Sequence, residues 1–451
     1  MRARALTSIG LLLAGCEGSS PSDGPFGADG QASNDGAAPL GADSASVADS
    51  SALDSSDGGL GSQGSGDASG PGRPGDSGDS SIPPHADSGD AAGSDSNSDA
   101  GQSGPDASAA TGPLVAYASG YGPNISVFHV DPVTGALTAQ GTTTAFGSSP
   151  SFLAVNRFAT NLYAVDEANP GRVGSYSIGR TDGALTDLNN NVSSAGSGPA
   201  FVSVDGTGKY VFVANYDTGT VAVLPVGAGG KLGAATDSQT AGMYAHMTLV
   251  DPSNQFVFVP CLGSDYIAQY RFDAVAGKLV PNAVPHVATA QMAGPRHMAF
   301  HPSGKYVYLI NETNSTMTAF AFDSAAGTLR EIETQPTAPQ GFMGVNTGSQ
   351  VVVHPSGKLV FGSNRGDDSI VVFAIDEATG KMTLKGYPKS GGAKPWDFTV
   401  DPTGTFLYAA NQDSNNIFPL RIDVAQGTLT PTASPVTVPT PSFIGIVRLP
   451  Q

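Results

Sequence analysis

One unit of about 46 to 53 residues recurs from residue 113 to the C-terminus, and this repeat constrains the fold more than any other feature. Each copy carries a turn of the form Gly-x-Leu, with one Met variant, at Gly135, Gly183, Gly230, Gly277, Gly327, Gly380 and Gly427. A second turn recurs with a polar anchor at Asn156, Asp205, Asp251, His301, His354 and Asp401. Each copy also holds about four short apolar or alternating runs rich in Val, Tyr, Phe and Thr, which indicates strands.

Four strands in a period of this length are typical of one blade of a β-propeller. The outer Gly-x-Leu turn occurs seven times but the anchored hairpin turn only six. The segment PSFIGIV (441–447) matches PSFLAVN (150–156), which opens the second period. We therefore expect an all-β, seven-bladed β-propeller over residues 113–451, with four antiparallel strands per blade. The C-terminal strand should complete the blade that residues 114 to about 140 begin, which removes free sheet edges.

The first 16 residues, MRARALTSIGLLLAGC, have the arginines, short apolar stretch and small-residue exit of a secretory signal peptide. The apolar part is too short to span a bilayer. The end of this segment, Leu13-Ala14-Gly15-Cys16, resembles the bacterial lipobox, whose cysteine is lipidated after cleavage. An ordinary signal peptide cut nearby is the alternative. We expect an exported bacterial lipoprotein, anchored to a membrane through Cys16 on the periplasmic or cell-surface side.

Residues 17–112 are dominated by Ser, Gly, Asp and Ala, so they offer little to bury and are expected to form a disordered linker. This segment holds sixteen acidic residues and one arginine, a net charge of −15. The signal segment adds two arginines, so residues from 113 onward carry −5 of the chain's net charge of −18. The low isoelectric point of the whole chain therefore comes mostly from the linker. The folded part has no basic patch, which argues against nucleic acid as a partner. With Cys16 lipidated, Cys261 has no partner for a disulfide.

The hairpin GPRHMAFHPSGKYVYLINE (294–312) predicts where a site would form in such a ring. Arg296 and His297 begin its first strand and Glu312 ends its second, and antiparallel pairing puts these residues at one edge. The first strand of each propeller blade lines the central channel, so the equivalent edges of all blades face one mouth. The mouth positions are Ser151, Phe152, Ala200, Phe201, His246, Met247, Arg296, His297, Ser349, Gln350, Trp396, Asp397, Asp166, Glu167, Asn215, Tyr216, Cys261, Asn311, Glu312, Asn364, Arg365, Asn411 and Gln412. This mouth is the candidate site.

Four runs carry a resemblance to a known family: HMTLVDPSNQFVFVPCLGSDYIAQYRFD (246–273), GPRHMAFHPSGKYVYLINE (294–312), HPSGKLVFGSNRGDDSIVVFAID (354–376) and DPTGTFLYAANQDSNNI (401–417). They resemble the seven-bladed lactonase family, which includes bacterial 6-phosphogluconolactonase and the fungal carboxymuconate lactonising enzyme. The resemblance covers essentially all of 113–451. It implies the propeller fold, lactone-ring hydrolysis and a catalytic set of His246, Arg296, Glu312 and Arg365. We expect substrate contacts from His297, Gln350, Asn364, Trp396 and Gln412.

The chain departs from the family pattern at five mouth positions. Family members often have histidine at the positions of Phe201 and Tyr244, aspartate at Cys261, glutamate at Gln350 and arginine at Trp396. Several polar positions have thus become apolar or neutral. This loss of polarity, together with export, points away from a phosphorylated cytoplasmic substrate. Trp396 has two interpretations, a platform for a sugar ring or a plug.

Lactone hydrolysis needs a base to activate water and cations to stabilise the oxyanion that forms. On this hypothesis His246 is the base, Arg296 and Arg365 bind the carboxylate or oxyanion, and Glu312 orients a ligand hydroxyl or one arginine. The structural alternative is an ion network that closes the channel, with His246 a hydrogen-bonded wall residue.

Two classes of function stay open. The chain is either a lactonase at the cell envelope, acting on a sugar-type or other small lactone, or a non-catalytic surface propeller that binds a ligand, polysaccharide or protein. His301 and His354 are interpreted as replacements of the turn aspartate. No histidine spacing fits a zinc motif, so no metal is expected, and no cofactor is implied. The protein is expected to be a monomer.

Overall fold

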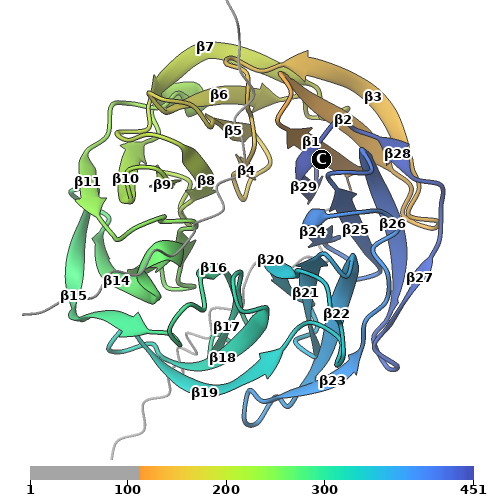
Figure 1. Cartoon of the computed structure of the whole chain (residues 1–451). Helices are drawn as coiled ribbons and strands as arrows, with labels where there is room; N and C mark the ends of the chain where they lie inside the picture. Colours follow the sequence, from red (N-terminus) through yellow and green to blue (C-terminus); the bar gives the residue numbers. More distant parts are fainter. Residues whose placement is uncertain (1–111, 451) are drawn as a thin grey trace, which may run out of the picture. The chain divides into compact units, whose positions relative to one another are not determined.

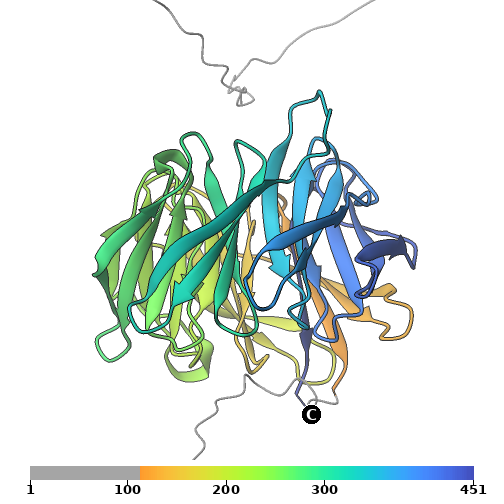
Figure 2. The ribbon, with the colours of Figure 1, turned by 90° about the horizontal axis from the view of Figure 1, so that it is seen from below.

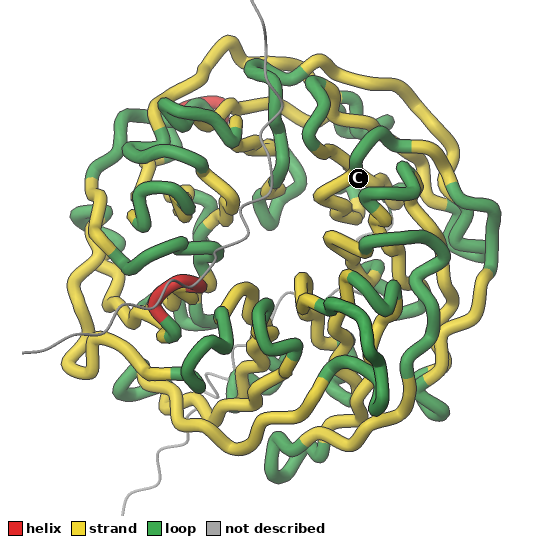
Figure 3. The backbone as a smooth tube through the Cα atoms, in the orientation of Figure 1, coloured by secondary structure: helices red, strands yellow, loops and turns green. Residues whose placement is uncertain are grey.

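The computed structural model describes residues 112–450, which form a closed ring of seven sheets around a central axis (Figure 1). The seven-bladed β-propeller predicted from the repeat is confirmed. The predicted signal peptide, the lipidation site Cys16 and the linker up to residue 111 lie outside the described residues. Within 112–450, no helix is long and apolar enough to cross a membrane. The helical segments there are two single 3₁₀ turns, coloured red in Figure 3.

The blades are numbered from the one that the C-terminus completes, and their strands are given from the axis outward. Blade 1 consists of β29 (Pro441–Arg448), β1 (Leu114–Gly120), β2 (Asn124–Val130) and β3 (Leu137–Thr144). Blade 2 consists of β4 (Leu153–Val155), β5 (Asn161–Asp166), β6 (Arg172–Ile178) and β7 (Leu185–Ser193). Blade 3 consists of β8 (Pro199–Val204), β9 (Tyr210–Asn215), β10 (Thr220–Pro225) and β11 (Asp237–Thr240), with the 3₁₀ turn η1 (Ala228–Gly230).

The remaining blades follow the same order. Blade 4 consists of β12 (Leu249–Val250), β13 (Phe256–Cys261), β14 (Tyr266–Asp273) and β15 (Lys278–Ala288), with η2 (Leu262–Ser264). Blade 5 consists of β16 (Pro295–Phe300), β17 (Tyr306–Asn311), β18 (Thr316–Asp323) and β19 (Thr328–Pro336). Blade 6 consists of β20 (Thr347–Val353), β21 (Leu359–Arg365), β22 (Ser369–Ile375) and β23 (Met382–Gly386). Blade 7 consists of β24 (Pro395–Val400), β25 (Phe406–Asn411), β26 (Asn416–Asp423) and β27 (Thr428–Pro431), and β28 (Val436–Thr437) also pairs with β26.

The second strand of each blade forms the main part of the core. All six residues of β17 (YVYLIN) and of β25 (FLYAAN) are buried, because both faces of these strands pack against neighbouring blades. The outermost strands instead alternate toward solvent, as in β7 (LTDLNNNVS). A near-continuous apolar run therefore marks a second strand, and a polar alternating run marks the rim.

The glycine of the Gly-x-Leu turn is required by packing between blades. Gly327 has φ +65, and a Cβ added there would lie 2.1 Å from the ring of Phe256 in the preceding blade. Gly380 has φ +73 and would meet the ring of Tyr306 at 2.5 Å in the same way. Gly135 and Gly277 likewise meet aromatic rings from the second strand of the preceding blade, those of Phe406 and Tyr210. Positive φ together with this close contact requires glycine at these four turns.

The anchors of the hairpin turns lie at the same end of each blade as the Gly-x-Leu turns, away from the end where the innermost strands begin. Asp251 Oδ1 accepts hydrogen bonds from the backbone N–H groups of Gln255 and Phe256, each at 2.7 Å. In the histidine variants, His301 Nδ1 accepts from Ser303 N at 3.1 Å, and its Nε2 lies 2.9 Å from Gly357 O of the next blade. His301 and His354 therefore replace the turn aspartate, as predicted, and also tie adjacent blades together.

The C-terminal strand closes the ring as predicted. β29 pairs antiparallel with β1 from Leu114↔Arg448 to Gly120↔Pro441, so blade 1 joins the two ends of the described chain (Figure 1). Seen edge-on, the C-terminal end lies at one face of the ring (Figure 2). β29 begins at the other face, and there the starts of the innermost strands meet the ends of the second strands.

Candidate functional site

Two successive residues near the start of every innermost strand form two stacked rings around the axis. The first ring consists of Ser151, Ala200, His246, Arg296, Ser349, Trp396 and Ser442. The second ring consists of Phe152, Phe201, Met247, His297, Gln350, Asp397 and Phe443. Six members of the first ring but only three of the second line one cavity at the mouth of the channel, so the second ring lies deeper.

This cavity has a volume of about 210 Å³ and opens on the face where β29 begins. Its lining consists of Tyr121, Ser151, Phe152, Glu167, Ala200, Tyr216, His246, Arg296, His297, Glu312, Arg365, Trp396, Asp397 and Ser442. The structure therefore brings together all four residues of the predicted catalytic set. Two of the predicted substrate contacts, His297 and Trp396, lie in the same lining.

One carboxylate joins the two arginines of the cavity. Glu312 Oε2 lies 2.9 Å from both Arg296 Nε and Arg365 Nη2. The N–H of Arg296 Nε does not point along this line, so that contact is an ion pair and not a directed hydrogen bond. The arginine side chains are only 3% and 7% exposed, whereas that of Glu312 is 25% exposed. Glu312 is thus the member of this group that a ligand reaches most easily.

Backbone carbonyls of blade 6 hold both guanidinium groups in place. Arg296 Nη1 donates to Ser349 O at 2.7 Å, and Arg365 Nη2 donates to Gly348 O at 3.0 Å. Burial and the nearby charge of Arg365 lower the pKa of Arg296 to about 10. Arg296 therefore still carries its charge at neutral pH, in a fixed orientation.

The indole of Trp396 forms one wall beside these cations. Arg365 Cζ lies 4.5 Å from the ring centroid, and Lys394 Nζ lies 5.2 Å from it. Tyr121 meets the same indole edge-on, with ring centroids 6.1 Å apart. Trp396 is half-buried, so part of its ring faces the cavity. It lines the cavity as a wall and does not plug it.

Two neutral imidazoles lie at the centre of the site. The rings of His246 and His297 are 5.1 Å apart in an edge-on arrangement, and both side chains are buried. Burial first, and then the charge of Arg296, lower the pKa of each histidine well below its usual 6.5. Within residues 112–450, His246 Nδ1 and His297 Nε2 have no hydrogen-bond partner. Neutral imidazoles with unpaired nitrogens are suited to accept a proton.

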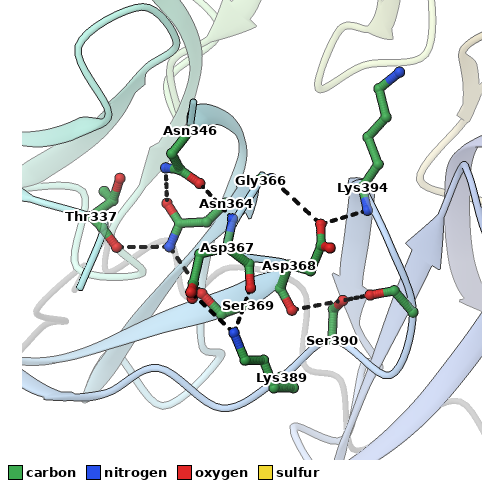
Figure 4. Close-up of polar contacts among 11 residues, drawn as sticks. Thr337, Asn346, Asn364, Gly366, Asp367, Asp368, Ser369, Lys389, Ser390 and Lys394 are labelled. Carbon is green, nitrogen blue, oxygen red and sulfur yellow. Dashed lines mark hydrogen bonds and ion pairs between the residues drawn. The ribbon is translucent and has the colours of Figure 1, made fainter. Parts of the chain in front are cut away.

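The turn that follows Arg365 is braced by a polar network (Figure 4). Asn364 Nδ2 donates to Thr337 O at 2.7 Å, and Asn364 Oδ1 accepts from Asn346 Nδ2 at 3.0 Å. Asp367 pairs with Lys389 at 3.0 Å. Because these contacts use the side chain of Asn364, this residue supports Arg365 from outside the cavity.

Three predicted substrate contacts lie outside the cavity lining. Asn364 belongs to the brace just described. Gln350 lies behind His297, and its Oε1 is 3.0 Å from His297 Nδ1. Gln412 is buried in the turn after β25, and its backbone N–H donates to Lys394 O at 3.0 Å. Alternation along a strand places a residue at the mouth but does not decide whether its side chain faces the axis or a neighbouring blade.

Other lining residues were not predicted as ligand contacts. Glu167 and Tyr216 end second strands at mouth positions, and burial raises both pKa values, that of Tyr216 to about 12. Tyr121 and Ser442 were missed entirely, because they belong to the blade that combines both ends of the chain. The match between PSFIGIV and PSFLAVN was the available signal, since it pairs Ser442 with Ser151.

The remaining departures from the family pattern take up different places. Phe201 packs in the second ring, with its ring 4.2 Å from that of Phe152 and 5.3 Å from that of His297. Tyr244 is exposed and stacks on Tyr216 at 4.6 Å. Cys261 is buried in the core, and burial raises its pKa to about 12. Within 112–450, no group of three His, Cys, Asp or Glu side chains is arranged to hold a metal ion.

Comparison with known proteins agrees with this architecture. Residues 114–446 match the family described as "Lactonase, 7-bladed beta-propeller". A 6-phosphogluconolactonase of Bacillus subtilis (strain 168) is 32% identical over 296 residues, which are 63% of this chain and 83% of that protein. A periplasmic gluconolactonase of Pseudomonas aeruginosa has a TM-score of 0.70 at 29% identity, covering 75% of this chain and 100% of that one. A putative 6-phosphogluconolactonase of Bacteroides fragilis NCTC 9343 has a TM-score of 0.69 at 26% identity, covering 75% and 98%.

The family match spans all seven blades, and the cavity with its histidines and arginines lies on the mouth face of that ring. This chain therefore belongs to the seven-bladed β-propeller lactonase family and is a hydrolase of the lactonase type.

Proposed function

We propose that this protein hydrolyses an unphosphorylated sugar-type lactone at the cell envelope. One observation carries the proposal: neutral histidines and two fixed arginines face a single cavity large enough for a small ring. A base and a pair of cations are the groups that ester hydrolysis requires. The family relatives named for lactonase activity support the same reaction class.

The chemistry follows from the charges. An imidazole takes a proton from water as the water oxygen attacks the lactone carbonyl, and the carbonyl electron pair moves onto oxygen. Arg296 and Arg365 face this oxyanion and lower its energy. The ring C–O bond then breaks, and the imidazolium returns its proton to the leaving alkoxide. Water and lactone give one hydroxy acid.

The cavity favours an uncharged, hydroxyl-rich ligand. Glu312 already neutralises part of the charge of Arg296 and Arg365, so the group keeps enough charge for a single developing oxyanion and too little for a phosphate dianion as well. Trp396 presents a ring face, which suits the C–H surface of a sugar. Glu312 and Glu167 supply acceptors for hydroxyl groups, and Tyr121 supplies a donor. The phosphate of a phosphorylated lactone would find an uncharged indole, not a cation, at the position of Trp396.

The cellular location is part of the proposal. The leader MRARALTSIGLLLAGC and the acidic segment after it fit an exported lipoprotein whose propeller stands off the membrane. The gluconolactonase relative from Pseudomonas aeruginosa is described as periplasmic. Lipid labelling of the chain in bacterial cells tests this point, and Cys16→Ala should abolish the label.

A lactone panel with the purified protein tests the activity. We expect faster hydrolysis of gluconolactone than of 6-phosphogluconolactone, each corrected for spontaneous opening. Arg271→Ala, an exposed arginine on β14, is the matched control for Arg296→Ala. A preference for the phosphorylated lactone would overturn the substrate class. Ligand binding without any hydrolysis would favour the binding-propeller alternative.

A further inference from the structure

A chain of hydrogen bonds crosses four successive innermost strands at the level of the second ring. His297 Nδ1 on β16 lies 3.0 Å from Gln350 Oε1 on β20. Gln350 Nε2 donates to Asp397 Oδ1 on β24 at 2.5 Å. The backbone N–H of Ile444 on β29 donates to Asp397 Oδ2 at 2.8 Å. The other four side chains of this ring are apolar or thioether groups, so the polar part forms one separate arc.

The backbone fixes the direction of this chain. The N–H of Val351 donates to Gln350 Oε1 at 2.9 Å, so the oxygen of the amide faces both Val351 and His297. The amide nitrogen then faces the Asp397 carboxylate, which accepts. Because an amide oxygen cannot donate, His297 Nδ1 must carry the proton. A neutral imidazole has only one N–H, so His297 Nε2 is left with a lone pair.

This lone pair has no protein partner. Within residues 112–450, His297 Nε2 is buried without a hydrogen bond, and His297 lines the cavity. A buried polar atom without a partner requires a specific explanation, such as a ligand or a catalytic role. No side-chain hydrogen bond sets the tautomer of His246 in the same way, because His246 Nδ1 has no partner within the described residues. His297 is thus the histidine whose accepting nitrogen the fold has fixed.

We propose that His297 is the proton acceptor in lactone opening, and that Gln350 and Asp397 are positioning residues that fix its tautomer. The inference rests on the proposed function and assigns a base within the same cavity. His297 Nε2 takes one proton from the attacking water, and the water oxygen forms the bond to the carbonyl carbon. The same proton passes to the ring oxygen when the C–O bond breaks, which restores the neutral imidazole.

The surrounding charges keep this base neutral. Burial, followed by Arg296, lowers the pKa of His297 well below 6.5, while the contact with Gln350 acts in the opposite direction. The charged and titratable groups that share the cavity with His297 are Arg296, Arg365, Glu312, Glu167, His246, Asp397, Tyr121 and Tyr216. The two arginines oppose an imidazolium, so the lone pair is present throughout the neutral pH range.

Nuclear magnetic resonance tests the tautomer without any substrate. The mature chain is labelled with ¹⁵N-histidine, and its histidines are assigned by single replacements with glutamine. We expect His297 to be protonated at Nδ1. His301 and His354 provide internal controls of the opposite tautomer, since their Nδ1 atoms accept from serine N–H groups. An Nε2-protonated His297 would mean that the Gln350 amide is turned round, and would overturn the proposal.

Kinetics tests the role. Gln350→Met keeps the side-chain length but removes the partner of His297 Nδ1, and kcat/KM should fall roughly tenfold, the weight of one buried hydrogen bond. Gln350→Glu should restore the acceptor and raise the pKa of His297, so the acid limb of the pH profile should move to higher pH. Gln335→Met, on the outermost strand β19, is the control and should change neither quantity.

The outcomes separate the two proposals. If the wild-type protein opens lactones but Gln350→Met and Gln350→Glu keep its rate and pH profile, the role of His297 is overturned and the proposed function stands. If the wild-type protein opens no lactone, the proposed function and the role of His297 both fail, and only the prediction that His297 is protonated at Nδ1 stands. Both proposals are supported if Gln350→Met lowers the rate while Gln350→Glu restores it and moves the acid limb of the pH profile to higher pH.

Discussion

The backbone N–H of Ile444 donates a 2.8 Å hydrogen bond to the carboxylate of Asp397. This bond joins the C-terminal strand β29 to β24, the innermost strand of the preceding blade, directly beneath the cavity. Closure of the ring and shaping of the site therefore depend on the same carboxylate. Blade 1, in which β29 pairs with β1, is therefore part of the candidate site, and Ser442 at the start of β29 lines the cavity.

Removal of the chain from Pro441 onward should open the ring. β1 would lose its antiparallel partner from Leu114 to Gly120, leaving an exposed strand edge of a kind that promotes aggregation. Size-exclusion chromatography with light scattering should show aggregates, and a chain that lacks only Gln451 is the control. A truncated chain that stays monomeric with an unchanged melting temperature would contradict the closure.

Asp397→Asn should change how stability depends on pH. Burial raises the pKa of Asp397 to about 7 in the folded state, well above its ordinary 3.8. The stability linked to this group is therefore fully present below about pH 4 and is lost as pH rises toward 7, at up to about 1.4 kcal/mol per pH unit. The asparagine variant cannot show this loss.

Melting temperatures of the wild-type protein and the Asp397→Asn variant at pH 5 and pH 8 measure the effect. From pH 5 to pH 8 the wild-type melting temperature should fall relative to that of the variant. The variant lacks one hydrogen bond at both pH values, so this loss does not affect the comparison. The protonation of His246 and His297 acts in the opposite direction at acid pH, because their pKa values are lowered, but it is common to both proteins. Parallel pH curves would show that Asp397 has no raised pKa.

Gly327→Ala should destabilise the contact between blades 4 and 5. The new Cβ would collide with the ring of Phe256 at 2.1 Å, and φ is +65. Overpacking of this kind costs about 1–3 kcal/mol, beyond the strain of an alanine at positive φ. Gly229→Ala is a matched control, because Gly229 has φ +70 and no atom within 4 Å of its added Cβ. Equal melting temperatures of the two variants would contradict the packing argument.

Arg296→Ala should lower lactone hydrolysis by about 10²–10³-fold, the usual effect of removing one oxyanion donor. The alternative, in which the arginines and Glu312 only hold the blades together, predicts a loss of folding instead, by about 3–5 kcal/mol for a broken buried pair. Circular dichroism alongside the assay separates these outcomes. Normal folding with normal activity would remove Arg296 from the site.

Trp396→Arg should shift substrate preference toward a phosphorylated lactone. The ring of Trp396 contacts both Arg365 and Lys394 at the cavity wall, so an arginine there would supply a cation that Glu312 does not neutralise. A charge-assisted hydrogen bond to phosphate should raise the relative kcat/KM about tenfold. Trp396→Phe keeps a ring without a charge and is the control. An unchanged preference in Trp396→Arg would place the specificity elsewhere.

The sequence by itself determined the architecture. The repeated Gly-x-Leu turn, the anchored hairpins and the match of PSFIGIV to PSFLAVN predicted seven blades and their closure, because each feature reflects a local backbone need that recurs once per blade. The residues of the cavity could also be placed near one mouth. Antiparallel pairing alone put Arg296, His297 and Glu312 at one edge of a hairpin.

Only the tertiary structure decided what each mouth residue does. Gln350 and Asn364 hold other side chains instead of facing the cavity, whereas Tyr121 lines it from a blade built from both ends of the chain. The neutral state of His297 depends on burial and on Arg296, and its tautomer depends on Gln350 in the next blade. The hydrogen-bond direction at His297 is set by Gln350 on the next blade, 53 residues along the chain, and its pKa is set first by burial inside the closed ring. Strand periodicity contains no information about such neighbours until the ring has closed.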